Sequence, residues 1–227
     1  MPNLETLDLR ECKNLEEVDP SLGHCRMHRE LDLSECEKLK KLPELKLGNL
    51  IVLTLRGCGG LTETPNFGDM PNLKYLNLRG CGGLTETPNF GDMPNLKTLD
   101  LGWWKNLEEV HHSLGHCRML TELDLSHCEK LKKLPEDLGS LQSLERLNVI
   151  FCQNLNELPR ELPPNLLELS ADYLLASKSI RDLVNQCLKL HKLSISWCGH
   201  CKCECIHLLQ QHLTRTYIQV FISPSHI

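Results

Sequence analysis

Leucines recur along this chain at fixed spacings. The phrase L-x-x-L-x-L-x-x-C-x-x-L, or a close variant of it, occurs nine times at intervals of 22 to 24 residues. The L-x-L alternation inside each phrase is typical of a strand with one buried face. A unit this short cannot bury its leucines alone, so neighbouring units must stack. The first position of the nine phrases is held by Leu4, His28, Leu50, Leu73, Leu96, Leu120, Leu144, Leu166 and Leu190.

This period and phrase match the leucine-rich-repeat signature. The sequence therefore predicts an α/β solenoid, a right-handed superhelix of leucine-rich repeats with a parallel β-sheet on its concave face. We expect the repeats to cover residues 1–198. Residues 199–227 should form a cysteine-rich cap or the start of a truncated β domain, with a strand at Thr216–Ile222. The apolar spacing in Ser177–Leu190 predicts a longer convex-side helix in the eighth repeat.

Two segments of the chain are internal copies. Leu55–Lys74 reappears letter for letter as Leu78–Lys97, and Lys13–Pro43 returns with a few changes as Lys105–Pro135. The offsets of 23 and 92 residues are one and four times 23, so the array grew by whole repeats. The tetrapeptide MPNL at the start of the chain also occurs inside the array. We therefore expect Met1 to be an internal residue of a longer array; the alternative is a true start with a frayed first repeat.

Two residues break the repeat pattern. His28 occupies a leucine position whose near-copy carries Leu120. A buried imidazole there needs a hydrogen-bond partner, so the second repeat should be locally weak. Trp104 stands in the cysteine slot, where an indole would overpack a site that suits a small thiol. This substitution predicts a local bulge at residues 102–104.

Charge and composition narrow the classes of partner. The net charge of −5 and the isoelectric point near 6.1 provide no basic field for nucleic acid. The lysine-rich runs Lys38–Lys41 and Lys130–Lys133 alternate with inward leucines and are interpreted as solvated surface. No apolar run reaches membrane-spanning length, and no signal peptide is recognised at Met1. We expect a cytoplasmic protein, found also in the nucleus, that binds neither nucleic acid nor membrane.

Ten of the thirteen cysteines fall into two groups that share Cys198. Seven occupy the same slot of successive repeats and are expected to be buried, unpaired thiols in a reducing compartment. The second group, with two nearby histidines, could form a zinc site or a redox-responsive module, but its C-x-C-x-C spacing is tight for one tetrahedral ion. A cap loop of free thiols is our expectation, without metal or cofactor. The candidate metal ligands are Cys198, Cys201, Cys203 and Cys205.

Catalysis has no recognisable motif in this sequence. The chain contains no phosphate-binding loop, no G-x-S-x-G elbow and no H-E-x-x-H. The adjacent pairs His24-Cys25 and His116-Cys117 occupy the same repeat position and are interpreted as convex-side packing. We therefore expect a binding module and not an enzyme.

One column of the repeat becomes aromatic along the array. Strand alternation sends the leucines inward and the intervening residues to the concave surface. This column lies at one edge of the predicted sheet, where early repeats carry glutamate or glycine and later repeats carry rings. Aromatic residues are enriched at interface hot spots. The sequence thus predicts a protein-binding patch; the alternative is a sideways ladder of rings that seals the bend after each strand. The rings are Trp103, His127, Phe151, Tyr173 and Trp197.

Three further side chains are predicted to lie on the concave surface and to contact a partner. They are Tyr75, Arg56 and Arg79. For these three the alternative is ordinary solvated surface.

Several phrases resemble one protein family. LDLSHCEKLKKLPEDLGSLQSLERLN at Leu123–Asn148, ELPPNLLEL at Glu161–Leu169 and the TPNFGDMPNLK units are similar to the repeat region of plant intracellular immune receptors of the TIR, nucleotide-binding and leucine-rich-repeat type, including virus-resistance proteins. The resemblance implies a role in plant defence. It also implies a protein partner: a pathogen effector, a guarded host protein, or the receptor's own nucleotide-binding domain.

In that family NAD cleavage belongs to the TIR domain, and neither this activity nor nucleotide binding can be placed on any residue here. A free-standing repeat adaptor or decoy is the alternative function, and a metal- or redox-responsive module at the cysteine cluster is another.

Overall fold

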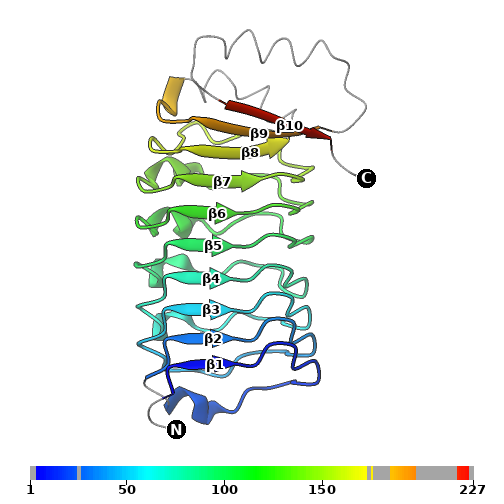
Figure 1. Ribbon diagram of the computed structural model, residues 1–227, viewed down its shortest axis with the longest axis vertical. Coiled ribbons are helices and arrows are strands. Elements are labelled where there is room, and N and C mark those ends of the chain that lie inside the picture. Colours follow the sequence, from blue (N-terminus) through cyan, green and yellow to red (C-terminus); the bar gives the residue numbers. More distant parts are fainter. Residues whose placement is uncertain (1–3, 25–26, 173–174, 176–184, 198–218, 225–227) are drawn as a thin grey trace.

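The chain forms a single parallel sheet whose strands follow sequence order (Figure 1). The computed structural model describes residues 4–24, 27–172, 175, 185–197 and 219–224. Ten strands pair side by side over these residues, and no strand crosses over another. The predicted leucine-rich-repeat solenoid is confirmed.

Most strands are three residues long and lie in exact step with the repeat. Leu7 pairs with Leu31 and Leu99 with Leu123, so equivalent positions align across the sheet. The strands are β1 Thr6–Asp8, β2 Glu30–Asp32, β3 Val52–Thr54, β4 Tyr75–Asn77, β5 Thr98–Asp100, β6 Glu122–Asp124, β7 Arg146–Val149, β8 Glu168–Asp172, β9 Lys192–Trp197 and β10 Gln219–Pro224.

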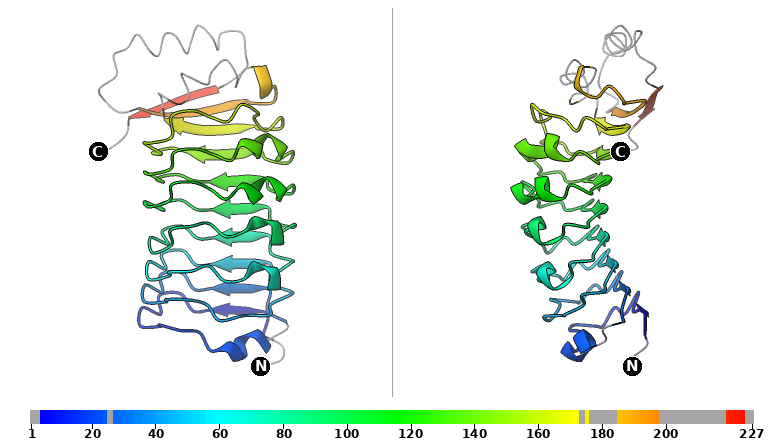
Figure 2. Two further views of the ribbon diagram at one scale, coloured as in Figure 1. Left: turned by 180° about the vertical axis from the view of Figure 1, so that it is seen from behind. Right: turned by 90° about the vertical axis from the view of Figure 1, so that its left-hand side faces the viewer.

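The opposite side of each described repeat carries 3₁₀ helices or irregular turns. The helices are wider than the strands, and the sheet lies on the concave side of a gently curved stack (Figure 2). These helices are η1 Pro20–His24, η2 Phe67–Asp69, η3 Phe90–Asp92, η4 His112–His116 and η5 Glu136–Ser140.

The C-terminal expectations are tested only in part. The strand predicted at Thr216–Ile222 is present as β10, which begins at Gln219 and pairs in parallel with β9. The helix predicted within Ser177–Leu190 lies mostly outside the described residues.

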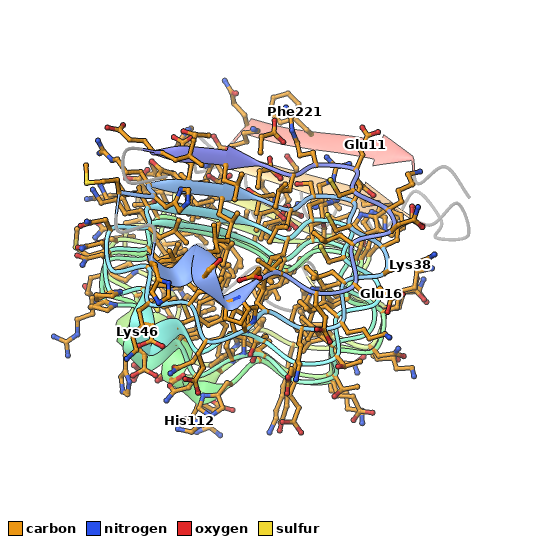
Figure 3. The ribbon with its side chains drawn as sticks, turned by 90° about the horizontal axis from the view of Figure 1, so that it is seen from below. Glu11, Glu16, Lys38, Lys46, His112 and Phe221 are labelled. Atoms are coloured by element: carbon orange, nitrogen blue, oxygen red, sulfur yellow. The ribbon has the colours of Figure 1, made fainter. Side chains whose placement is uncertain are left out.

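Inward leucines fill the space between the sheet and the convex side. Viewed along the stack, Phe221 and Glu11 lie on the sheet side and His112 lies on the opposite side (Figure 3). Between these faces the leucines of the central repeats have essentially no exposed surface. Each repeat contributes the same side chains at the same height, so the core is one continuous column.

The cysteine slot forms a hydrogen-bonded ladder. The Cys58 thiol donates to the carbonyl oxygen of Leu33 at 3.2 Å, and the Cys128 thiol donates to that of Leu101 at 3.3 Å. Burial raises the pKa of both thiols to about 12, which keeps them protonated and unreactive. These cysteines are free and buried. The predicted burial is confirmed for the slot cysteines from Cys36 to Cys152, but it is wrong for Cys12, which is exposed in the first described repeat, and Cys198 lies outside the described residues. The carbonyl partners were not predicted.

Trp104 replaces the thiol without distorting the stack. Its indole is fully buried, and its Nε1–H donates to the carbonyl oxygen of Leu78 at 2.5 Å, as the thiols do in neighbouring repeats. The backbone hydrogen bonds from Leu101 to Asp124 and from Trp103 to Ser126 keep the ordinary register. The bulge predicted at residues 102–104 is therefore wrong, because the indole keeps the hydrogen bond of the slot as well as filling it.

His28 is a weak point of the core. The residue is 1% exposed, and neither ring nitrogen has a hydrogen-bond partner. Burial lowers the pKa of the imidazole below its usual value, so it is neutral near pH 7. The hydrogen bond that the sequence analysis required is missing.

The described end of the stack before β2 is more open than its middle. Leu7, Leu9 and Leu15 are only partly buried there, whereas Leu31 and Leu33 are buried. A hollow of about 800 Å³, lined by these first-repeat leucines and by His28, opens at this end.

The lysine-rich runs pair with acidic residues one repeat earlier. Lys40 contacts Glu16 at 3.0 Å, and Lys132 forms the equivalent contact with Glu108. The two pairs come from the two copies of the Lys13–Pro43 block, which are offset by 92 residues, and all of these side chains are well exposed. The runs are thus solvated, and Lys40 and Lys132 are each paired with a glutamate.

Among the described residues, no helix has the length and apolar character needed to cross a membrane.

Candidate functional site: the concave face and its aromatic rim

The candidate site begins where each strand ends in a tight turn. The last strand residue is usually aspartate or asparagine, and its side chain accepts a hydrogen bond from the backbone N–H two residues later. In β5, for example, Asp100 Oδ1 accepts from Gly102 N at 2.9 Å. This short-range contact closes the turn and limits most strands to three residues. The sequence analysis missed this role, although the polar column before each turn carried the signal.

In each described turn, the residue after this N–H donor has a left-handed backbone. Gly57 and Gly80 have φ of 72° and 73°, and Trp103, His127 and Phe151 have φ of 61° to 64°. Glu11 and Glu35 share this conformation in the first two repeats. The aromatic column is therefore a turn position that favours glycine, and each non-glycine residue there costs about 1–2 kcal/mol.

Three rings of this column stack on one another. The centroids of Trp103 and His127 are 3.9 Å apart with a 16° angle between the ring planes. His127 also contacts Phe151, at a centroid distance of 4.5 Å. We call Trp103, His127 and Phe151 the aromatic ladder. The stacking matches the sideways arrangement that the sequence analysis held as its alternative.

The ladder is nevertheless open to solvent at its Trp103 end. Trp103 is 40% exposed, whereas His127 and Phe151 are half-buried. Burial and the nearby Arg79 guanidinium lower the pKa of His127, so the central ring is neutral near pH 7. Among the described residues, the stack ends at Trp103, whose indole has a ring contact only with His127.

Two of the predicted rings fall outside this description. Tyr173 lies outside the described residues, and Trp197 ends β9 with a side chain that is also outside them. The candidate metal ligands lie in the same undescribed part of the chain: Cys198, Cys201, Cys203 and Cys205. Within the part that the structure describes, no group of three or more histidine, cysteine or acidic side chains is arranged to hold a metal ion.

Two carboxylates hold the Arg79 side chain in place on the concave surface. Its Nη1 lies 3.5 Å from Asp100 Oδ1 and 3.7 Å from Asp124 Oδ2, so the side chain reaches across the next two repeats. It crosses over Gly102, where a Cβ atom would collide with the guanidinium. Arg79 therefore organises the surface beside the ladder instead of standing free in solvent. Asp100 and Asp124, which hold this side chain, were not among the predicted contact residues.

Tyr75 and Arg56 are exposed on the same face. Tyr75 is 45% exposed and lies beside a shallow hollow of about 270 Å³ that also involves Thr54, Asp100 and Glu122. Arg56 lies 3.7 Å from Glu35, with both side chains largely in solvent. Both side chains are exposed, as predicted. Tyr75 is the first residue of β4 and lies at the other end of the strand from the turn column, whereas Arg56 directly precedes Gly57 of that column.

A second charged column lies at the start of the later strands. Glu122 pairs with Arg146 at 2.9 Å, and Glu168 pairs with Lys192 at 2.8 Å. Because neighbouring repeats alternate in sign here, the charges neutralise one another locally. The strongest uncompensated feature of the described concave side is thus aromatic and not electrostatic.

Comparisons with known proteins agree with this architecture. Two leucine-rich-repeat family models match residues 3–25 and residues 116–132. TMV resistance protein N of Nicotiana glutinosa is 45% identical over 65 residues, which are 29% of this chain and 6% of that protein. The chain thus matches only a small part of this relative's length.

Solved structures share the fold at low sequence identity. A leucine-rich-repeat protein of Leptospira interrogans is similar over 97% of this chain and 55% of its own, with a TM-score of 0.60 and 20% identity. The leucine-rich repeat domain of the type III effector XopL is similar over 75% of this chain and 77% of that domain, with a TM-score of 0.53 and 21% identity. The chain is therefore a leucine-rich-repeat solenoid, an architecture that typically serves protein–protein interaction without catalysis.

Proposed function

We propose that this chain is the sensing or autoinhibitory repeat region of a plant disease-resistance receptor, and that its concave face binds a protein. The observation that carries the binding site is the aromatic ladder with its open end at Trp103. A tryptophan left 40% exposed at a turn position that favours glycine is costly in the free protein. A partner that covers the indole would recover the cost of its exposed apolar surface, and buried tryptophans are frequent interface hot spots.

The surroundings of the ladder support a protein partner over other classes. The concave surface carries paired charges beside the ladder, such as Arg79 with Asp100, and an exposed tyrosine, Tyr75, at the start of β4. This mixture of an apolar centre and a polar rim is typical of protein interfaces. A nucleic acid would require a continuous basic surface, and the net charge is −5.

The defence role rests on the partial likeness to TMV resistance protein N. In that role the partner is a pathogen effector, a guarded host protein or the nucleotide-binding domain of the same receptor, in the cytoplasm or nucleus. A free-standing adaptor would share the binding surface but would bind a protein unrelated to pathogen recognition. The identity of the partner distinguishes these functions.

Proximity labelling in plant cells tests the proposal. The 227-residue chain, joined to a labelling enzyme, is compared with a Trp103→Gly, Phe151→Gly variant and with a Glu11→Gly control. Glycine is the suitable replacement because Gly57 and Gly80 hold the same turn in neighbouring repeats. The control changes the same turn position away from the ladder.

We expect a protein that is labelled by the wild type and the control but not by the double variant. If that protein is a pathogen effector, a guarded host protein or a receptor nucleotide-binding domain, the defence role is supported. An unrelated host protein would contradict the defence role while supporting the binding surface. Identical labelling by all three chains would contradict the binding surface itself.

A further inference from the structure

The concave face has a gap above β5, whose first residue is small. In the register of the sheet, Thr98 of β5 lies between Tyr75 of β4 and Glu122 of β6. Neighbouring strands are about 4.8 Å apart, so the two larger side chains stand on strands that are roughly 10 Å apart. The hollow of about 270 Å³ described above lies here, and we call it the Thr98 hollow.

Every charged side chain that lines the Thr98 hollow is a carboxylate. Arg79 and Arg146 pair with these carboxylates but do not line the hollow. In the ion pairs of the described residues, three carboxylates therefore share two guanidinium groups, and one negative charge lacks a counter-charge. The three carboxylates belong to Asp100, Glu122 and Asp124.

Asp100 has the weakest contacts of the three. Its Oδ1 accepts a hydrogen bond from Gly102 N at 2.9 Å and lies 3.5 Å from Arg79 Nη1. Its Oδ2 accepts no hydrogen bond from the described residues. Glu122 and Asp124, in contrast, each accept a side-chain hydrogen bond, at 2.9 and 3.0 Å. Burial, and after it the charge of Asp124, raises the pKa of the Asp100 carboxyl, as expected for a carboxylate without a full counter-charge.

A basic side chain with a long stem fits this arrangement. Thr98 and Asp100 are two residues apart on β5, which corresponds to about 7 Å along the strand. The three or four methylene groups of arginine or lysine cover a distance of this order, and such stems pack along apolar surface while the charged end stays in a polar environment. The stem would lie over Thr98 beside Tyr75, with the charged end at Asp100.

Other occupants suit the hollow less well. An acidic side chain would be repelled by the carboxylates, and a neutral one would leave the charge of Asp100 uncompensated. A bare metal ion requires several ligands around one point, and the described residues offer no group of three or more acidic, histidine or cysteine side chains in such an arrangement.

We propose that the Thr98 hollow receives an arginine or lysine side chain of the protein partner, whose charged end pairs with Asp100. The inference rests on the proposed protein-binding function and names the chemistry of one contact outside the aromatic ladder. Tyr75, at the other end of the strand from the turn column, is the wall beside the incoming stem.

The proposal can be tested without knowing the partner. N-acetyl-argininamide and N-acetyl-lysinamide are titrated separately into the ¹³C- and ¹⁵N-labelled 227-residue chain, and the Thr98 methyl and Asp100 amide signals are followed by NMR. With at least one of them we expect saturable shifts at both groups and a dissociation constant of roughly millimolar, the strength that a single small contact can reach. The uncharged counterparts N-acetyl-citrullinamide and N-acetyl-norleucinamide should leave both signals unchanged.

A substitution at Thr98 blocks the hollow from within the chain. Thr98→Tyr fills the space, and Tyr75 shows that this column of the sheet accepts a tyrosine. It should abolish the shifts of the Asp100 amide. Thr6→Tyr is the matched control, because β1 and β5 share the sequence Thr-Leu-Asp, and it should leave binding unchanged.

A second substitution removes the charge and keeps the fold. In Asp100→Asn the turn should remain closed, because Asn77 accepts the equivalent backbone hydrogen bond in β4. Loss of a charged partner should weaken binding of the basic probe about tenfold or more. Asp8→Asn, at the same position of β1, is the control and should bind as the wild type does. If Thr98→Tyr does not fold, Asp100→Asn carries the test.

The outcomes separate this proposal from the one on which it rests. Equal shifts with the uncharged probes, shifts that persist in Thr98→Tyr, unchanged affinity in Asp100→Asn, or no shifts with either basic probe would each overturn the basic occupant. If the labelled partner is nevertheless lost in the Trp103→Gly, Phe151→Gly variant, the protein-binding function stands and only the chemistry of the hollow is wrong. If the basic probe binds as expected but labelling is identical in all chains, the ladder is wrong and the hollow keeps its specificity for a cation.

Discussion

At the scale of single residues, a few side chains depart from the repeat, and two of them adapt to it in opposite ways. Trp104 fills a cysteine slot and keeps the slot's hydrogen bond to a carbonyl oxygen. His28 fills a leucine slot and leaves both ring nitrogens without a partner. The first substitution is therefore integrated into the stack, and the second should weaken it.

Replacing His28 with leucine should stabilise the chain. The near-copy of this repeat buries Leu120 at the same position, so the substitution restores a matching side chain. Removing an unsatisfied buried polar group should raise the free energy of unfolding by about 1–3 kcal/mol. Urea denaturation at pH 7.5 measures the change, and no gain would show that the imidazole is satisfied in solution.

The same residue predicts a pH dependence. The folded-state pKa of His28 is lowered, so below about pH 6.5 the unfolded chain binds a proton that the folded chain resists. The free energy of unfolding should therefore fall as the pH decreases from about 6.5 to 5. In His28→Leu, the part of this pH dependence that comes from the imidazole should disappear. A wild type and variant with parallel pH profiles would contradict the assignment.

Trp104→Cys restores the repeat consensus and should still destabilise the chain. The cavity left by the fully buried indole should cost about 3–5 kcal/mol, although the thiol can keep the hydrogen bond. Thermal unfolding measures the loss. The neighbouring Trp103→Gly is the control, because its ring is partly exposed and glycine suits its backbone. Equal stability of Trp104→Cys and wild type would show that the slot closes around the smaller side chain.

At the scale of the structural element, each unit is a short strand followed by a left-handed turn. This turn explains the glycines of the column, and the glutamate and aromatic residues adopt the same left-handed backbone at a cost. The sequence predicted where this column lies on the sheet but not its left-handed backbone. The two consecutive glycines of this column, Gly57 and Gly80, are the sequence signal that could have indicated the left-handed backbone.

Glycine and alanine should behave differently at this turn. At Phe151, glycine should remove the strain of the left-handed backbone, whereas alanine should retain it. The free energy of unfolding of Phe151→Gly should therefore exceed that of Phe151→Ala by about 1 kcal/mol. Urea denaturation of both variants checks the difference. An alanine variant as stable as the glycine variant would contradict a left-handed backbone at Phe151.

Much of the fold could be predicted from the repeat because each unit contacts mainly its neighbours. The strands, the leucine core and the buried cysteines follow from position in the phrase alone. The tether of Arg79 could not be predicted in this way, because it depends on carboxylates one and two repeats later and on the missing side chain of Gly102. Trp104 was misjudged because volume was considered without the hydrogen bond of its slot.

At the scale of the whole molecule, the stack is a linear array whose units stabilise one another. Each middle repeat is covered by a neighbouring repeat on both sides. In the first described repeat, Leu7 and Leu9 are partly exposed and lie near His28, whose ring nitrogens have no hydrogen-bond partner. Stability in such an array is close to a sum of unit and neighbour terms. Local opening should thus be easiest at this end.

Hydrogen–deuterium exchange should show that gradient. Amides of β1 and β2 should exchange at least about tenfold faster than those of β4 to β6, a ratio that corresponds to roughly 1.4 kcal/mol. His28→Leu should narrow the difference. Uniform protection from β1 to β6 would contradict an array that opens from its first described repeat.

The central claim is that the aromatic ladder binds a protein. Once labelling has identified the partner, its dissociation constant is measured for the wild type, Trp103→Gly and the turn-matched control Glu11→Gly. A buried tryptophan hot spot contributes about 2 kcal/mol or more, so Trp103→Gly should weaken binding roughly 30-fold or more while Glu11→Gly changes it less than about twofold. If Trp103→Gly binds as tightly as the wild type, the ladder seals the turns of the stack and the binding surface lies elsewhere.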